Sequence, residues 1–242
     1  INTESFAAYQ AGLNGEMDKY GEAAVGYDKI YRLMPQDTSF LYNAALVNSV
    51  GKNHEMAISQ YQELLDLGYT GITTIYTARS TVNDEVLNYS SYGDMMGQVK
   101  LKIAKDPKTE VTKSKYMDMI KAIGSNYLAL DNNEKALEFI RQARAENPTD
   151  YNLIIEEGTI YFKMGDNQKY MEKLEEAVQI KPDEAELHYV IGTIILESKE
   201  NLDEVKEHLE KAIELDPKHS NAYLNMGAVF FKELKPIEDE MN

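Results

Sequence analysis

Apolar residues recur along most of the chain with the three- and four-residue spacing of an amphipathic helix. One frame sets large residues around a central glycine, as at Gly124. A second frame ends before a proline and carries small residues, as at Ala136 and Ala143 before Pro148. Proline stops a helix, and small residues let two helices approach closely. Together the frames predict a pair of helices joined by a short turn.

The two frames return at a regular period in the second half of the chain. The framework glycines Gly124, Gly158, Gly192 and Gly227 are spaced 34, 34 and 35 residues apart. The prolines Pro148, Pro182 and Pro217 follow at 34 and 35, and the small positions are Ala136, Ala143, Ala177 and Ala212. A glycine inside a helix costs about 1 kcal/mol relative to alanine. We therefore expect each glycine to accommodate the paired helix, and we expect an all-α fold.

This pattern closely resembles the tetratricopeptide repeat, a pair of antiparallel helices in about 34 residues. The resemblance implies a right-handed α-α superhelix whose first helices line a concave groove, where partner peptides usually bind. It assigns repeats to 113–150, 151–184 and 185–219, and a half repeat to 220–242. Residues 1–71 fit as two degenerate repeats in which tyrosines replace aliphatic residues. No linker rich in Gly, Ser or Pro separates the halves, so one continuous solenoid is expected.

The period fails over residues 72–112, which are expected to form an insert that interrupts a repeat. Two runs of β-forming residues, Thr73–Thr77 and Val86–Tyr89, favour a small β-hairpin. A degenerate helix followed by a long loop fits the same residues equally well. A helix is expected over Ser91–Ala104, and the first helix of the next repeat is expected from Glu110 onward.

Composition excludes several classes of function. The chain has 25 basic and 41 acidic residues, a net charge of −16, whereas binding to nucleic acid or anionic lipid requires a basic face. No apolar run approaches the roughly 20 residues that cross a bilayer, so membrane insertion is not expected. The sequence has no cysteine, which excludes disulfides, thiolate metal sites and cysteine nucleophiles.

The charge is uneven along the chain, because residues 131–242 hold most of the negative excess. The insert and the helix after it are basic, with lysines at Lys100, Lys102, Lys105, Lys108, Lys113, Lys115 and Lys121. This run of lysines can bind an acidic partner, or it can dock on the acidic half of another copy. It can also be a solvated face, which is the more common reason for such a run.

The sequence offers no support for catalysis. The four histidines, His54, His188, His208 and His219, do not fall in a metal-ligand spacing. His188 occupies a framework position of its repeat, which favours a core role. The glycines occur one per repeat, so they do not form a phosphate loop. We expect no enzymatic activity, no metal and no cofactor.

The groove implied by the resemblance is the remaining candidate site. Carried over by repeat position, its residues are Tyr42, Asn43, Leu46, Asn152, Ile155, Thr159, Phe162, Tyr189, Thr193, Leu196, Leu224, Asn225, Ala228 and Phe231. Aromatic and amide side chains with little charge suit an extended or helical peptide of mixed polarity. The alternative is that some of them, the aliphatic ones above all, fill space between helices.

One subclass of ligand is not expected. The carboxylate clamp of the chaperone-binding members would need Lys with Asn or Arg at matched groove positions. Here Lys121 is followed by Ser125 at the next such position. Binding of the C-terminal tails of chaperones is therefore not expected.

The expected function is a non-enzymatic scaffold that binds a protein or peptide in its groove. The alternative is a structural self-assembly module that joins copies through the unpaired C-terminal helix and the basic insert. The chain begins at Ile1 without methionine, which suggests a processed product. A loose similarity to envelope-associated tetratricopeptide proteins of Gram-negative bacteria favours the periplasm or envelope. The final half repeat suggests that the natural chain continues or that this end docks on another subunit or a groove.

Overall fold

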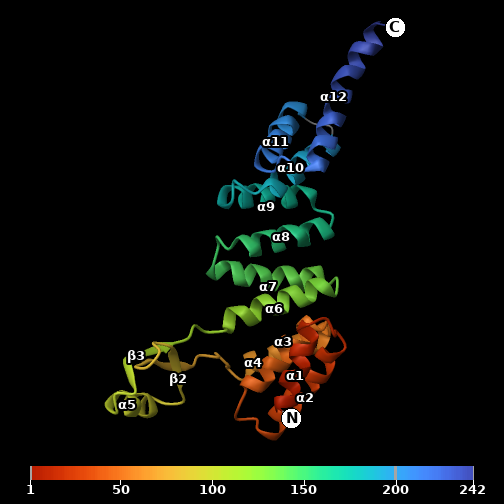
Figure 1. Ribbon diagram of the computed structural model, residues 1–242. Helices are drawn as coiled ribbons and strands as arrows, with labels where there is room; N and C mark the ends of the chain where they lie inside the picture. The colour runs from red at the N-terminus through yellow and green to blue at the C-terminus, as the bar shows by residue number, and fades with distance from the viewer. Residues whose placement is uncertain (1, 199–200, 242) are drawn as a thin grey trace. The chain divides into compact units, whose positions relative to one another are not determined.

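The computed structural model describes residues 2–198 and 201–241, and most of them are helical (Figure 1). The helices are α1 (Asn2–Leu13), α2 (Lys19–Leu33), α3 (Ser39–Val50), α4 (His54–Asp66), α5 (Tyr92–Lys100), α6 (Tyr116–Ala129), α7 (Asn133–Glu146), α8 (Tyr151–Lys163), α9 (Asn167–Ile180), α10 (Ala185–Ser198), α11 (Leu202–Leu215) and α12 (Ser220–Met241). The chain divides into two compact units, Ile1–Asn126 and Tyr127–Asn242. The expected all-α repeat architecture is confirmed.

The first unit contains two helix pairs, α1–α2 and α3–α4. Their core combines buried tyrosines, such as Tyr27 and Tyr61, with alanines that are fully buried, such as Ala44 and Ala57. The alanines bring the helix backbones together, and the tyrosines fill the remaining space. Packing thus explains the buried tyrosines of these helix pairs.

The insert is a three-stranded antiparallel sheet covered on one face by α5. Its strands are β1 (Thr74–Ser80), β2 (Val86–Tyr89) and β3 (Ala104–Val111), in the order β2-β1-β3. Ala78, Met95 and Ala104 are its fully buried residues. The hairpin is therefore present, and the alternative of a degenerate helix with a long loop is wrong.

The third strand of the insert was not expected from the sequence. β3 is an edge strand that is exposed after its first residue, so it lacks the alternating pattern of a half-buried strand. It contains Pro107, which an edge strand tolerates because one side of its backbone has no partner. Since β3 reaches Val111, helix α6 begins at Tyr116 and not at Glu110, and α5 ends at Lys100. The insert lies between the pairs α3–α4 and α6–α7 and divides neither pair.

In the second unit the framework residues have the packing roles that their types suggested. Ala136, Ala143, Ala177 and Ala212 are fully buried. A Cβ added at Gly158 would lie 3.2 Å from the Cβ of Lys173, and one at Gly192 would lie 3.2 Å from the side chain of Leu209. These glycines therefore accommodate the second helix of their pair. Among the described residues, a Cβ added at Gly227 on α12 would meet nothing within 4 Å apart from the backbone of its own helix.

Candidate functional site

Three helices of the first unit enclose an open pocket of about 210 Å³. Its lining comes from α3 (Leu46, Ser49), α4 (His54, Tyr61) and α6 (Ala122, Ser125, Asn126). The small side chains of Ala122 and Ser125 on α6 leave room beside Leu46, which is 37% exposed. α3 and α6 are the first helices of their pairs, so the pocket lies on the side where the resemblance places a groove.

The floor of this pocket is a hydrogen-bonded network around Asn126, which is 4% exposed. Its Nδ2 donates to the Ser49 hydroxyl and to the Ala122 carbonyl oxygen, both at 2.7 Å. Because a carbonyl oxygen only accepts, this fixes the orientation of the amide. Asn126 Oδ1 then accepts from His54 Nδ1 at 2.7 Å. In the neutral imidazole, His54 Nε2 is therefore an acceptor.

Tyrosines and a lysine extend the site along α3. The Tyr42 ring contacts the Tyr61 ring edge-on at 6.1 Å between centroids, and the Tyr69 ring at 5.8 Å. Lys115 Nζ lies 4.1 Å from the centroid of the Tyr42 ring, in cation–π contact. Burial raises the pKa of Tyr42, and the nearby Asp118 raises it further, so its hydroxyl stays protonated at neutral pH.

The expected groove residues of the first unit do not lie together. Tyr42 contacts Tyr61, and Leu46 lines the pocket. Asn43 instead lines another open pocket with Tyr27 and Phe40. The candidate site therefore keeps two of these three residues.

In the second unit the expected groove residues divide by exposure. Asn152, Ala228 and the large apolar residues Phe162 (58%), Leu224 (70%) and Phe231 (79%) are exposed, while Ile155, Thr159, Tyr189, Thr193 and Asn225 are half-buried. Asn225 Nδ2 donates to Thr193 Oγ1 at 2.8 Å, which joins the first helices α10 and α12. Leu196 is only 8% exposed and belongs to the core cluster. It is therefore removed from the groove set.

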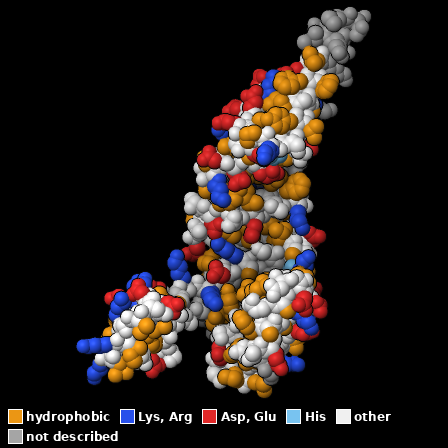
Figure 2. Space-filling model, viewed as in Figure 1, with side chains coloured by type: hydrophobic (Ala, Val, Ile, Leu, Met, Phe, Trp, Pro, Cys, Tyr) orange, Lys and Arg blue, Asp and Glu red, His pale blue; other side chains and the backbone are white. Residues whose placement is uncertain are grey.

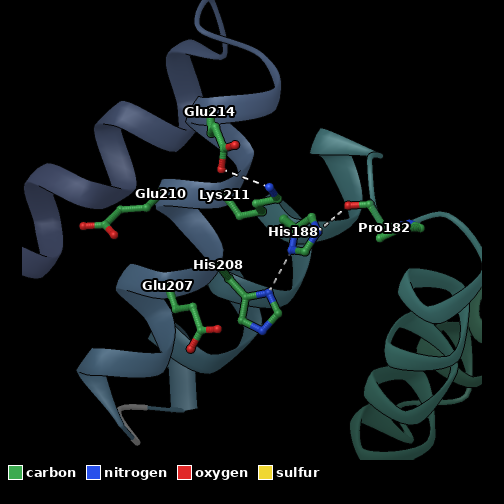
Figure 3. A pocket seen from close by; sticks show the side chains of 7 residues that line it. All are labelled: Pro182, His188, Glu207, His208, Glu210, Lys211 and Glu214. Atoms are coloured by element: carbon green, nitrogen blue, oxygen red, sulfur yellow. Dashed lines mark hydrogen bonds and ion pairs between the residues drawn. The ribbon is translucent and has the colours of Figure 1, made fainter.

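A second open pocket, of about 590 Å³, lies against α10 and α11 (Figure 3). The imidazole of His188 is buried, and its Nε2 donates to the Pro182 carbonyl oxygen at 3.0 Å. His188 Nδ1 is then an acceptor, so His208 Nδ1, 3.3 Å away, donates to it. Burial lowers the pKa of His208, and His188 lowers it further. The expected core role of His188 is confirmed.

The rim of this second pocket, which we name the outer pocket, is acidic. Glu207, Glu210 and Glu214 come from successive turns of α11, and Lys211 bonds to Glu214 at 2.9 Å. Among the described residues, no group of three or more His, Asp or Glu side chains could hold a metal ion. In the same residues, no helix is long and apolar enough to cross a membrane.

Part of the first pocket could have been found from the sequence. Ser49 and Ser125 hold positions of the helical frame that the groove residues follow, so extending the frame would have included them. His54 and Tyr61 come from the second helix of the pair, and no pattern in the sequence indicates that they reach the pocket.

Comparisons with known proteins agree with this architecture. The family model of the tetratricopeptide repeat matches residues 185–219. The photosystem I assembly protein Ycf3 of Synechococcus elongatus is 40% identical over 68 residues, which is 26% of this chain. The match spans 39% of the length of that curated relative.

Solved structures resemble the chain over most of its length. The crystal structure of MamA has a TM-score of 0.57 at 18% identity and covers 87% of this chain and 95% of that chain. YrrB, described as a tetratricopeptide-repeat protein with an unusual peptide-binding site, has a TM-score of 0.54 at 18% identity. The match covers 90% of this chain and 88% of that chain. At such identity the likeness shows the fold alone. The repeat frames, the helix pairs and these matches agree: residues 185–219 match the tetratricopeptide repeat, and the chain has the helical fold of tetratricopeptide-repeat proteins.

Proposed function

We propose that the protein is a non-enzymatic scaffold that binds a segment of a partner protein along the first helices of its pairs. The observation that carries this proposal is the pocket between α3, α4 and α6. It combines an apolar rim at Leu46 and Ala122 with a floor whose polar groups are fixed by Asn126. A concave apolar site with a few oriented polar groups is the usual form of a binding pocket.

The chemistry of the pocket specifies the kind of segment that fits it. Its volume of about 210 Å³ suits one aliphatic side chain. His54 Nε2 can accept a hydrogen bond from a backbone N–H of the bound segment. Beside it, Tyr42 and Lys115 offer an aromatic face and a positive charge. We therefore expect an extended or helical segment with an aliphatic anchor, and we expect its polar or acidic residues near Lys115.

The named relatives support a role in binding. YrrB is described as having a peptide-binding site, and Ycf3 is named as an assembly protein. We also propose a location in the cell envelope. The basis for this location is the loose sequence similarity to envelope-associated tetratricopeptide proteins.

Site-specific photo-crosslinking in native extract tests the proposal. A photoreactive residue replacing Leu46 should capture a defined segment of one partner. The control is the same residue at Leu33 of α2, which is 74% exposed and so offers more chance contacts. Equal capture at both positions would mean that the pocket has no binding role.

Self-assembly is a second candidate function, favoured by an observation on α12. Gly227 repeats the position of Gly158 and Gly192, yet a Cβ added there would meet no other helix within 4 Å in the part of the chain that the structure describes. On the same face, one turn before and after it, Tyr223 and Phe230 are each 51% exposed. α12 therefore presents the face that α8 and α10 use to pack on a second helix. Sedimentation velocity at several concentrations separates a self-associating chain from a monomer.

A further inference from the structure

One end of the insert exposes aliphatic side chains. Two turns meet there, residues 81–85 between β1 and β2 and residues 101–103 between α5 and β3, and we name this end the tip. Val82 is 91% exposed, Leu101 67% and Ile103 48%. Lys100 and Lys102, on either side of Leu101, are also exposed. Basic side chains project from the insert at the lower left of Figure 2.

Hydrogen bonds and ion pairs connect the two turns of the tip. The Thr81 backbone N–H donates to the Ile103 carbonyl oxygen at 3.0 Å, and the Thr81 hydroxyl donates to the carbonyl oxygen of Lys102 at 3.0 Å. Asp84 and Lys102 have φ near +60°, which costs a non-glycine residue on the order of 1 kcal/mol. Asp84 is fixed there by Arg79 at 2.8 Å and Lys105 at 2.9 Å.

These aliphatic residues do not serve the fold of the insert. Its buried residues are Ala78, Met95 and Ala104, with Tyr76, Tyr89, Met96 and Val99 packed around them. Val82, Leu101 and Ile103 lie outside this cluster. Exposed aliphatic residues on a hydrogen-bonded backbone lose little backbone entropy on binding, which favours a contact surface.

The outer pocket on α10 and α11 is complementary to the tip. Leu101 lies between two lysines, while the outer pocket lies among Glu207, Glu210 and Glu214. Its inner wall is formed by Pro182 and the histidine pair (Figure 3). A leucine entering this pocket would bring its flanking lysines to the carboxylates of the rim.

We propose that the tip of one copy docks in the outer pocket of a second copy, with Leu101 inserted and with Lys100 and Lys102 paired to Glu207 and Glu210. This inference rests on the self-assembly candidate and adds two contact surfaces that are separate from the exposed face of α12. The surfaces differ, so the contact is heterologous and each added copy leaves a free tip and a free pocket. The interface is small and salt-dependent, so association is expected at roughly 10 to 100 micromolar protein.

Charge reversal tests this pairing by sedimentation velocity over that concentration range. The variant K100E/K102E should associate at least tenfold more weakly than the native chain. The matched control is K108E/K113E, which changes the exposed Lys108 of β3 and the exposed Lys113 just after the insert and gives the same net charge. E207K/E210K should also weaken association, and the chain carrying all four reversals should regain it. Circular dichroism verifies that each variant is folded.

Three results would refute the docking of the tip in the outer pocket. Association that responds equally to K100E/K102E and to K108E/K113E refutes the tip contact and leaves the self-assembly candidate standing. A native chain that stays monomeric refutes both the tip contact and the self-assembly candidate. If the monomer instead sediments with phosphatidylserine vesicles and K100E/K102E does not, the tip binds a bilayer and the proposal is wrong. The groove proposal is unaffected by any of these results.

Discussion

His188 on α10 and His208 on α11 share one hydrogen bond between their Nδ1 atoms, 3.3 Å apart. With His188 Nε2 committed to Pro182, the pair is satisfied when both rings are neutral. His188, Glu204, Glu207 and Glu175 are the charged or titratable groups that act on His208, and the glutamates of α9 and α11 partly offset the effects of burial and of His188.

This pair predicts lower stability in acid. The pKa of His208 is lower in the folded chain than its ordinary value of 6.5, so the unfolded chain binds more protons in that range. The free energy of unfolding should therefore fall as the pH decreases below about 6.5. Urea unfolding at pH 7.5 and 5.5 measures the difference. The change in the free energy of unfolding between these two pH values should be smaller in His208→Gln. An unchanged pH dependence in this variant would contradict the role given to His208.

Asn126 is predicted to be important for the stability of the first unit. Asn126→Ala removes the partner of Ser49 and His54 inside the pocket, and a polar group left unsatisfied costs about 1–3 kcal/mol. We expect a loss in that range by urea unfolding. Asn152→Ala, at an exposed position of α8, should change stability by less than about 0.5 kcal/mol. Equal effects at the two positions would show that the network is not stabilising.

A buried carboxylate predicts a similar loss in the second unit. Glu157 is 4% exposed and pairs with Arg144, and it accepts from Arg141 Nε at 3.1 Å. Removing one partner of a buried ion pair costs roughly 3 kcal/mol. Glu157→Ala should show this loss in chemical unfolding, while Glu146→Ala at an exposed position should not. A stable Glu157→Ala chain would mean that Arg144 is satisfied by its other acceptors.

Two framework glycines should respond differently to substitution by alanine. Gly227 is inside α12 with open space around it, so Gly227→Ala should stabilise the chain by about 0.5–1 kcal/mol through helix propensity. Gly192→Ala places a methyl group 3.2 Å from Leu209, and this strain should cancel the gain. Thermal unfolding of dilute protein compares the two. A larger gain at Gly192 would contradict the packing described.

The repeat frames predicted the helix pairs because one set of residues encodes both packing and turns. Alanines mark where two helices touch, and Pro148 and its equivalents mark where the second helix ends. β3 was missed because an exposed edge strand needs no alternation. Leu196 was misplaced because its groove position is covered by neighbouring helices in this chain.

The pocket between α3, α4 and α6 could not be predicted from the sequence, for a different reason. Asn126 bonds to residues that precede it by 77 and 72 positions, with the whole insert between them. No local pattern records such a contact. Extending the helical frame would have included Ser49 and Ser125. The role of Asn126 becomes visible only when α6 is seen to pack on α3 and α4.

The most direct test of the binding proposal is calorimetric titration of the segment crosslinked at Leu46, made as a synthetic peptide. Ala122→Leu fills the pocket and leaves the backbone acceptor of Asn126 in place. Ala145→Leu, at an exposed alanine of α7, is the matched control. We predict at least a tenfold rise in Kd for Ala122→Leu, about 1.4 kcal/mol, and a change below twofold for Ala145→Leu. Native affinity in the Ala122→Leu chain would contradict a binding role for this pocket.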